Sequence, residues 1–393
     1  MTRRIAVYTG NRAEYGLLSP ILQSIDADPA LELQLIVGGS HLDDTFGRTR
    51  DEIVADGFEV AAETPAGLGR DTARAIGEGV LAITDILEQL SPDIVVVYGD
   101  RFEAFAALIA ATQSNVPVAH VEGGDKTEGG ALDDSVRHAM TKLAHVHLAT
   151  NPEAAWRIEA MGDEPWRIHT VGLPVIDRIK AGDFPEPTEV ADRLGLDLER
   201  PVILFTQHAI TTEPDQAVAQ LEPSLTAMDQ AIADHGAQVV ATYPNNDDGG
   251  EAILTRLKGW SKDNENIVLR QSLGRALYHG TLNVCGRITR GLCLGNSSSG
   301  LKETPAFACP TVNVGTRQSG RLAADNVLHV GYDAIALADA IERCITDDAF
   351  RTLSATCPNP YGEGETGPKV ARILRELDLG DIRLLQKKLT LDP

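Results

Sequence analysis

The sequence lacks three features that define whole classes of protein. No run of its 393 residues approaches the ~20 consecutive apolar positions of a membrane-spanning helix, and the first residues enter a strand-like segment without an apolar signal region. The five cysteines are odd in number and form no CxxC pair, so neither a disulfide framework nor a zinc ribbon is expected. We therefore expect a cytoplasmic protein with reduced thiols and no membrane partner.

Positive charge is scarce as well. The chain carries 35 Lys+Arg against 57 Asp+Glu, a formal net charge of −22. Proteins that bind nucleic acid neutralise phosphates with a basic face, so a nucleic-acid partner is not expected. A small phosphorylated ligand remains compatible, because it needs only a few local cations. The acidic excess indicates solubility or, alternatively, a salt-rich cytoplasm.

Short apolar runs alternate with helical patterns along both halves of the chain. Continuous apolar strands indicate parallel sheets that helices cover on both faces. We expect strands at Ile5–Thr9, Leu33–Val37, Ile94–Tyr98, Val116–Val121, Val146–Ala149, Val202–Thr206, Val239–Tyr243, Ile267–Leu269 and Thr311–Val314. We expect helices at Tyr15–Asp26, Asp71–Gln89, Arg101–Gln113, Asp134–Ala144, Gln216–His235, Glu251–Lys258 and Leu301–Phe307.

This pattern predicts an α/β protein with two Rossmann-like, doubly wound domains that face a cleft. The length also favours two domains over one. We place them at residues 1–179 and 188–368, with the proline-containing segment Lys180–Pro187 as the linker or, alternatively, as a long surface loop. Ligands of open parallel sheets gather at the carboxyl ends of the strands, so we expect the functional residues in the segments that follow each strand.

Charged residues follow the strands of the first half. Arg12 lies beside glycines at a helix start, where an anion is favoured, although the motif is neither GxGxxG nor GxxxxGK[ST]. Asp100 follows the strand Ile94–Tyr98, where capping of the next helix is the alternative role. Glu122 and Asp133 follow the next strand, and if the strands are neighbours these three carboxylates converge and shift one another's pKa values.

Histidines near these acids raise the question of a metal. His120 and Glu122 form an H-x-E step that is not HExxH, and His138 and His145 lie two helical turns apart. No metal is expected, and His138, His145 and His147 are interpreted as packing or hydrogen-bonding residues.

The second half offers a nucleotide site. His208 and Asn245 follow two strands, and the loop Gly295–Gly300 supplies backbone amides and the hydroxyls of Ser297 and Ser298 for a pyrophosphate. Glu303 is placed to accept bonds from ribose hydroxyls; a serine helix cap with a nearby acid is the alternative. Arg317 and Arg321 follow the next strand, where they favour phosphate.

Taken in order, these segments resemble the UDP-N-acetylglucosamine 2-epimerase family, specifically its hydrolysing branch. The matching motifs are NRAEYG at Asn11–Gly16, GDRFEA at Gly99–Ala104, HVEGG at His120–Gly124, DDSVRHAMTKLAH at Asp133–His145, QHAITTE at Gln207–Glu213, YPNND at Tyr243–Asp247, GNSSSGLKE at Gly295–Glu303 and GTRQSGR at Gly315–Arg321. The resemblance implies a fold of the glycosyltransferase-B type, with a C-terminal helix at about residues 369–385 that crosses back onto the first domain. Lys369–Leu377 is the candidate segment for this helix. It implies conversion of UDP-GlcNAc and water to ManNAc and UDP, without a cofactor, by a homodimer or homotetramer that feeds sialic acid-type synthesis.

The resemblance also implies roles for single residues. The catalytic acids would be Asp100, Glu122 and Asp133. The nucleotide-sugar site would be lined by Arg12, Arg101, His208, Asn245, Ser297, Ser298, Glu303 and Arg317, to which we add His120 and Arg321. The segment between Gly124 and Asp133 is about two residues longer than in vertebrate relatives, which leaves Asp134 as an alternative to Asp133. Gly286–Gly291 resembles an insertion, and Gly16 and Leu17 replace a Ser-Lys pair.

Other activities stay open at this point. The same chemistry can act on a diacetamido sugar or a GDP-linked sugar, and a non-hydrolysing epimerase would return UDP-ManNAc. A glycosyltransferase shares the fold type but binds an acceptor, and a nucleotide-sugar sensor would bind without turnover. Three carboxylates in one cleft favour proton transfer over acceptor binding, whereas the sensor stays an open alternative.

Overall fold

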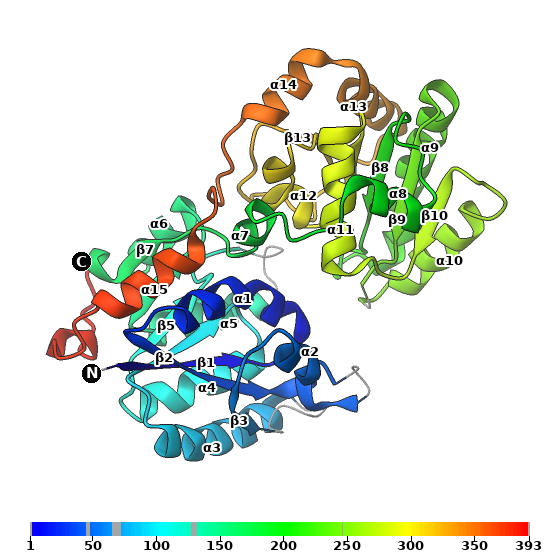
Figure 1. Ribbon diagram of the computed structural model, residues 1–393. Helices are drawn as coiled ribbons and strands as arrows, with labels where there is room; N and C mark the ends of the chain where they lie inside the picture. The colour runs from blue at the N-terminus through cyan, green and yellow to red at the C-terminus, as the bar shows by residue number, and fades with distance from the viewer. Residues whose placement is uncertain (1, 45–47, 65–71, 127–131, 246, 392–393) are drawn as a thin grey trace. The chain divides into compact units, whose positions relative to one another are not determined.

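The computed structural model describes residues 2–44, 48–64, 72–126, 132–245 and 247–391 (Figure 1). The chain divides into two compact units. The first comprises Met1–Arg178 and Tyr361–Pro393, and the second comprises Ile179–Pro360. No helix of the described residues is long and apolar enough to cross a membrane.

The first unit is built on a seven-stranded parallel sheet in the order β3-β2-β1-β4-β5-β6-β7. Its strands are β1 (Arg3–Thr9), β2 (Leu31–Gly38), β3 (Val60–Thr64), β4 (Ile94–Tyr98), β5 (Val118–Val121), β6 (Val146–Ala149) and β7 (Ile168–Thr170). Alternate residues of β1 enter the two cores on opposite faces, Ile5 and Val7 on one and Ala6 and Tyr8 on the other. The expected burial of the strands on both faces is confirmed.

Helices cover both faces of this sheet (Figure 1). They are α1 (Arg12–Asp26), α2 (Arg50–Ala55), α3 (Thr72–Leu90), α4 (Phe102–Gln113), α5 (Leu132–Leu143), α6 (Pro152–Ala160), α7 (Val175–Lys180) and α15 (Thr366–Glu376), with short helical turns at Gly39–Leu42, Pro165–Arg167 and Ile382–Leu384. Helix α3 corresponds to the helix expected at Asp71–Gln89, whose first residue, Asp71, lies outside the described residues.

Helix α15 returns the chain to the first unit and lies against α1. The carboxylate of Asp177 accepts bonds from the backbone N–H groups of Thr366 (2.9 Å) and Gly367 (2.7 Å), and so supplies partners to the helix start. A Cβ at Gly367 would lie 2.3 Å from the carbonyl oxygen of Pro20, so glycine permits the close approach of the two helices.

The second unit holds a six-stranded parallel sheet in the order β10-β9-β8-β11-β12-β13. Its strands are β8 (Val202–Thr206), β9 (Gln238–Thr242), β10 (Ile267–Arg270), β11 (Leu292–Gly295), β12 (Thr311–Val314) and β13 (Val327–Val330). Its helices are α8 (Pro187–Leu194), α9 (Ala217–His235), α10 (Gly250–Trp260), α11 (Gly274–Asn283), α12 (Ser299–Lys302), α13 (Ala334–Thr346) and α14 (Asp348–Thr356), with 3-10 turns at Pro214–Gln216 and Thr304–Phe307.

Two parallel α/β sheets confirm the predicted fold class, with local corrections. The single helix expected at Leu301–Phe307 is wrong: α12 ends at Lys302 and a 3-10 turn follows, because Pro305 has no N–H to continue an α-helix. The apparent insertion Gly286–Gly291 overlaps a π-helical turn, Val284–Ile288, that extends α11. All five cysteines are free thiols.

Candidate active site

A buried arginine organises the acids at the carboxyl edge of the seven-stranded sheet. Asp100 follows β4, and its carboxylate accepts a hydrogen bond from the guanidinium of Arg137 on α5. The side chain of Arg137 is 6% exposed, and Asp134 lies 4.0 Å from its other nitrogen. Burial lowers the pKa of Arg137, but Asp100, Glu122 and Asp125 together raise it above its usual value. Asp100 and Glu122 thus both act on one cation.

Glu122 occupies an unusual backbone conformation directly after β5. Its φ angle is +64°, a region that side chains other than glycine rarely adopt, and its side chain is buried. Burial raises the pKa of the Tyr98 hydroxyl at the end of β4, and Glu122 raises it further. The strained position holds the Glu122 carboxylate beside a protonated phenol.

The buried side chain of His120 on β5 contacts the end of the neighbouring strand β4. Its Nε2–H donates to the carbonyl oxygen of Gly99 (2.7 Å), and its Nδ1 lies 3.3 Å from the Thr141 hydroxyl. Burial lowers the pKa of His120 to about 3, so the ring is neutral. Both nitrogens contact the protein interior, which places His120 under the Gly99–Asp100 turn. Its expected contact with a nucleotide sugar stays a prediction.

The third expected acid falls in part outside the description. Asp133 belongs to helix α5, but its side chain is outside the described residues. Asp134, the alternative, is 15% exposed and pairs with Arg137. The choice between Asp133 and Asp134 therefore stays a prediction.

The helix that follows β1 begins at Arg12, as expected. Arg12 is largely exposed and forms a paired contact with Glu52, at 2.9 Å from each of two guanidinium nitrogens. The side chain of Asn11 caps α1 by accepting from the backbone N–H of Glu14 (3.0 Å). The carboxylate of Glu14 in turn accepts from the backbone N–H of Gly10 (3.2 Å). Arg12 thus pairs with Glu52 from the first turn of a capped helix, and its expected contact with an anion stays a prediction.

Two buried glutamates lie close together at this edge, and sequence reasoning missed both. Burial raises the pKa of Glu14 to about 8, and the charge of Glu103 on α4 raises it as well. Burial also raises the pKa of Glu103, against the opposing effect of Arg101, whose Nε lies 3.5 Å from the carboxylate. Both glutamates stand inside quoted motifs, NRAEYG and GDRFEA, but nothing in the letters signals their burial.

Asp100 does not occupy the N-cap position of helix α4. The residue at the N-cap of α4 is Arg101, which makes no side-chain capping bond. Arg101 is exposed and its guanidinium lies 5.4 Å from the centre of the Phe102 ring. The bond to Arg137 therefore gives Asp100 a defined partner other than the helix start.

Of the three histidines interpreted as packing or hydrogen-bonding residues, His145 and His147 contact defined partners. His145 Nδ1 accepts from the N–H of Val118 (3.1 Å), and burial lowers the pKa of His145 to about 4. His147 lies 3.3 Å from the fully buried carboxylate of Asp163. His138 on α5 is partly buried, which lowers its pKa. Among the described residues, no group of three or more His, Cys, Asp or Glu side chains is arranged to hold a metal ion.

In the second unit, four neighbouring strand ends meet in one network. Asn296, after β11, accepts from the N–H of His208 (2.7 Å) and donates to the carbonyl of His208 (2.9 Å). His208 Nδ1 in turn accepts from the N–H of Asn245 (3.0 Å). Arg317, after β12, donates to the carbonyl of Asn296 (3.2 Å). The structure thus brings together His208, Asn245 and Arg317 through a residue that was not expected.

Charge and glycine geometry define this network further. Burial lowers the pKa of His208 to about 4, and the charge of Arg317 lowers it as well, so the imidazole is neutral. A Cβ at Gly295 would lie 1.9 Å from the carbonyl oxygen of Thr206, so only glycine lets the two strand ends approach. Gln318 donates to the carbonyl of Asn296 (2.9 Å) and accepts from Arg321 (2.8 Å). Arg321 is thereby joined to the same network.

The loop Gly295–Gly300, which contains Ser297 and Ser298, precedes Glu303, a residue that pairs with the buried His279. Ser298 stands at the N-cap of α12 without a side-chain capping bond, so the serine cap weighed as an alternative is not formed there. Ser297 precedes it, and its carbonyl accepts from the N–H of Gly300 (3.1 Å). Glu303 accepts from His279 on α11 (3.0 Å). Burial raises the pKa of Glu303, but His279, Ser299 and Lys302 together outweigh it and leave the pKa lower than usual.

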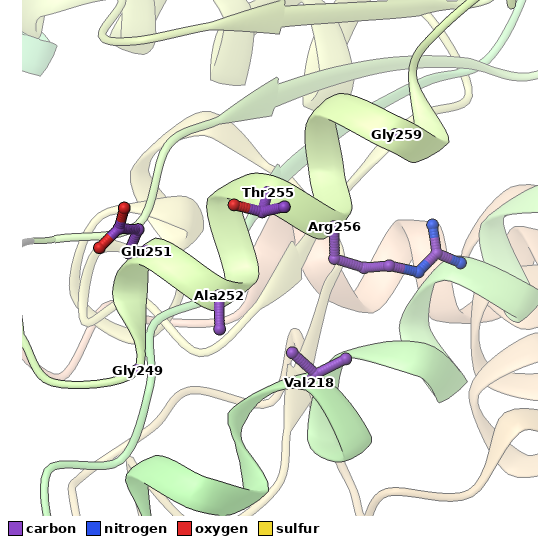
Figure 2. A pocket seen from close by; sticks show the side chains of 7 residues that line it. All are labelled: Val218, Gly249, Glu251, Ala252, Thr255, Arg256 and Gly259. Carbon is purple, nitrogen blue, oxygen red and sulfur yellow. The ribbon is translucent and has the colours of Figure 1, made fainter.

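A hollow of about 780 Å³ on the second unit lies elsewhere. It is lined by residues of α9 and α10, among them Val218, Glu251, Thr255 and Arg256 (Figure 2). Arg256 reaches across to Glu222 on α9, with nitrogen-oxygen distances of 2.5 and 3.0 Å. None of the predicted site residues lines this hollow.

Comparison with known proteins identifies the family. The model of the family described as UDP-N-acetylglucosamine 2-epimerase matches residues 23–375. The chain is 33% identical over 356 residues to the UDP-N-acetylglucosamine 2-epimerase of Neisseria meningitidis serogroup B, covering 88% of this chain and 90% of the relative. It is 32% identical over 385 residues to the hydrolysing UDP-N,N'-diacetylbacillosamine 2-epimerase of Legionella pneumophila, covering 96% and 97%.

Solved structures share the fold. A UDP-GlcNAc 2-epimerase from Neisseria meningitidis bound to UDP-GlcNAc aligns with a TM-score of 0.77 at 16% identity, covering 95% of this chain and 99% of that chain. The enzyme from Methanocaldococcus jannaschii aligns with a TM-score of 0.74 at 18% identity, covering 94% and 99%. The predicted fold of the glycosyltransferase-B type is confirmed by this likeness.

Proposed function

Because the chain belongs to the UDP-N-acetylglucosamine 2-epimerase family, we propose that it is a hydrolysing 2-epimerase, which converts UDP-GlcNAc and water to ManNAc and UDP. The observation that carries the proposal is the set of carboxylates around the buried Arg137, with Asp100 bonded to it and Glu122 within electrostatic reach. The sugar product would supply sialic acid-type synthesis.

The reaction explains why several carboxylates are needed. The C2 proton of the sugar is weakly acidic, and it leaves most easily as the bond from C1 to the UDP oxygen breaks, which gives 2-acetamidoglucal. Water then adds across the double bond: its oxygen joins C1, and a proton reaches C2 from the opposite face. The steps require a base at C2, an acid that delivers the new C2 proton and a base for water. Asp100, Glu122 and Asp133 are the proposed set.

Asp100 has a cationic partner at the sheet edge. Its carboxylate accepts a hydrogen bond from the guanidinium of Arg137, which fixes the orientation of the group proposed as a base. Glu122 stands next to Tyr98 in a buried position and lies within electrostatic reach of Arg137. Different surroundings for two acids at one edge are the arrangement that general acid–base chemistry uses.

The second unit would hold the leaving group. UDP departs as an anion, so cations and backbone amides near the pyrophosphate stabilise the developing charge. Arg317 and Arg321 meet at one end of the network around Asn296. Glu303, ionised beside His279, is the proposed acceptor for the ribose hydroxyls. Ser297, Ser298, His208 and Asn245 are proposed to line the same site, while Arg12 and Arg101 would contribute from the first unit.

The decisive experiment follows the product in deuterated water. We expect phosphorus NMR to show UDP and proton NMR to show free ManNAc that carries deuterium at C2, with the same rate after EDTA treatment. Accumulation of UDP-ManNAc would instead assign the chain to the non-hydrolysing branch. Retention of protium at C2 would reject the elimination.

A second substrate is favoured by one relative. The Legionella pneumophila enzyme, hydrolysing and named for UDP-N,N'-diacetylbacillosamine, is similar over nearly the whole chain. The same elimination would proceed on that sugar, because the atoms at C1 and C2 are common to both. Parallel measurements of kcat/KM with UDP-GlcNAc, with the UDP-linked diacetamido sugar and with its GDP-linked counterpart decide the substrate. The nucleotide sugar with the highest kcat/KM is the preferred substrate.

A further inference from the structure

The segment after helix α15 is fastened to the first unit at several points. The guanidinium of the fully buried Arg167 donates to the carbonyl of Leu384 (2.8 Å) and to the carbonyl of His145 (3.1 Å). Farther along, the N–H of Thr390 donates to the carbonyl of Gly162 (3.0 Å). These bonds fix the chain on both sides of Lys387.

The ammonium group of Lys387 lies at the C-terminal end of helix α5. It donates to the carbonyls of Lys142 (2.9 Å) and Ala144 (2.6 Å), and the carbonyl of Thr141 lies at 3.5 Å. The last carbonyls of a helix have no partners within the helix, and the helix dipole makes this end negative. A cation there supplies both the missing donors and the favourable charge.

A buried carboxylate completes the arrangement. Lys387 lies 2.6 Å from Oδ1 of Asp163, and Lys142 donates to Oδ2 of the same carboxylate (2.8 Å). The side chain of Asp163 is fully buried and that of Lys387 is 16% exposed. Two ammonium groups thus share one carboxylate, and the helix end offsets part of the remaining positive charge.

Helix α5 connects this cap to the acids at the sheet edge. Its Arg137 bonds to Asp100, and its Thr141 donates to the carbonyl of Arg137 (2.9 Å). Thr141 also lies against His120, which holds the carbonyl of Gly99 next to Asp100. A displacement of the helix end would therefore shift the partners of Asp100 on both sides.

We propose that Lys387 is a positioning residue: by capping α5 from the C-terminal segment, it holds the helix in the place where Arg137 meets Asp100. Its effect on catalysis rests on the proposed function, whereas its effect on α5 does not. The segment after α15 would then fix the position of helix α5, which carries Arg137, the partner of Asp100.

The test compares two neighbouring lysines. Lys387→Met keeps the apolar stem but removes the charge and the donors, while Lys388→Met alters an exposed side chain and leaves its backbone bond to Glu164 in place. We expect the amides of residues 134–143 to exchange hydrogen about tenfold faster or more in Lys387→Met and at the parent rate in Lys388→Met. Lys387→Arg, which keeps charge and donors, should restore slow exchange.

Activity provides the second measurement. In Lys387→Met we expect kcat to fall about tenfold, with KM for the nucleotide sugar within about twofold, because a 1 Å misplacement of catalytic groups is costly. Unchanged exchange in α5 would overturn the proposal, as would faster exchange with an unchanged kcat. If Lys387→Met does not fold, Lys387→Gln is measured in its place. A parent enzyme without turnover would reject the proposed function alone, and the exchange data would still decide the cap.

Discussion

Helix capping and proton transfer predict different outcomes at Asp100. If Asp100 moves a proton, Asp100→Asn keeps the shape but should lose about 10²–10⁴-fold in rate. UDP affinity should stay within about twofold, because the proposed contacts to UDP lie mainly in the second unit. Turnover and UDP calorimetry measure both, and Asp51→Asn, at a side chain that is 70% exposed, is the matched control. An Asp100→Asn variant that turns over near the parent rate would exclude Asp100 as the base.

Arg317 makes a prediction about binding. Its guanidinium belongs to the network that joins Asn296 and His208. Charge-assisted contacts to phosphate contribute about 1.5–3 kcal/mol, so Arg317→Ala should weaken UDP binding by roughly tenfold or more. Arg343→Ala, at a surface ion pair with Asp347, should leave the affinity unchanged. Equal UDP affinity of both variants by calorimetry would show that Arg317 does not contact the nucleotide.

Glu14 makes a prediction about pH. Burial, together with the charge of Glu103, raises the pKa of Glu14 from its ordinary 4.5 to about 8. The folded state then binds a proton that the unfolded state releases, so this group lowers the free energy of unfolding progressively as the pH rises from about 5 to 8. Glu14→Gln cannot ionise and should remove that loss, a contribution on the order of a few kcal/mol.

The measurement for Glu14 is the melting temperature at pH 5, 6, 7 and 8. We expect the difference between Glu14→Gln and the parent to grow in favour of the variant with increasing pH. The exposed Glu59→Gln serves as the control and should show a constant difference. A constant difference for Glu14→Gln as well would mean that Glu14 is ionised in the folded state.

Among the structural elements, β11 depends on one glycine. Gly295 has φ +129°, and a Cβ there would meet the carbonyl oxygen of Thr206 at 1.9 Å, so Gly295→Ala must displace β11 from β8. Denaturant titration should show a loss of about 3 kcal/mol or more. Gly259→Ala, in helix α10 with no atom within 4 Å of the new Cβ, should instead raise stability by about 0.5–1 kcal/mol. Equal stability of the two variants would contradict this account of the β11 end.

The elements differ in how well their sequence predicts them. Buried central strands such as β1 and β4 are apolar runs between polar segments, and both were found. Strand β3 reads VAAET at the sheet edge, with alternating exposure, and carries too weak a signal. Strand β11 (Leu292–Gly295) is buried throughout but reads LCLG, without a β-branched or aromatic residue, and was missed, whereas the equally short β12 reads TVNV and was found. Runs rich in β-branched residues, rather than burial itself, are what the letters reveal.

The candidate site divides in the same way. Residues directly after strands, such as Asp100 and His208, could be predicted, because parallel strand ends meet at one edge of a sheet. Arg137 lies four residues beyond Asp133 inside a helix, and only the packing of α5 brings it to Asp100. Asn296 and His279 act through other side chains, His208 and Glu303, and the sequence does not show such pairings.

At the scale of the whole molecule, charge predicts a dependence on salt. The chain carries a formal charge of −22, and repulsion among like charges destabilises a compact state. Salt also weakens surface ion pairs such as Arg12–Glu52, but each exposed pair contributes only about 0–1 kcal/mol. With 35 cationic side chains for 57 acids, repulsion dominates. We therefore expect the melting temperature to rise by several degrees as KCl increases from about 0.05 to 1 M, where the screening length falls to about 3 Å.

A variant with fewer charges separates screening from other effects of salt. Exposed acids on both units can be neutralised together: Asp85→Asn, Glu159→Gln, Asp192→Asn, Glu199→Gln and Glu251→Gln. These five changes bring the net charge from −22 to −22 + 5 = −17. At low KCl the variant should melt at a higher temperature than the parent, and its melting temperature should rise less with added KCl, because less repulsion remains to be screened. If the melting temperatures of the two proteins rise equally with KCl concentration, screening of charge repulsion is not the cause of the stabilisation by salt.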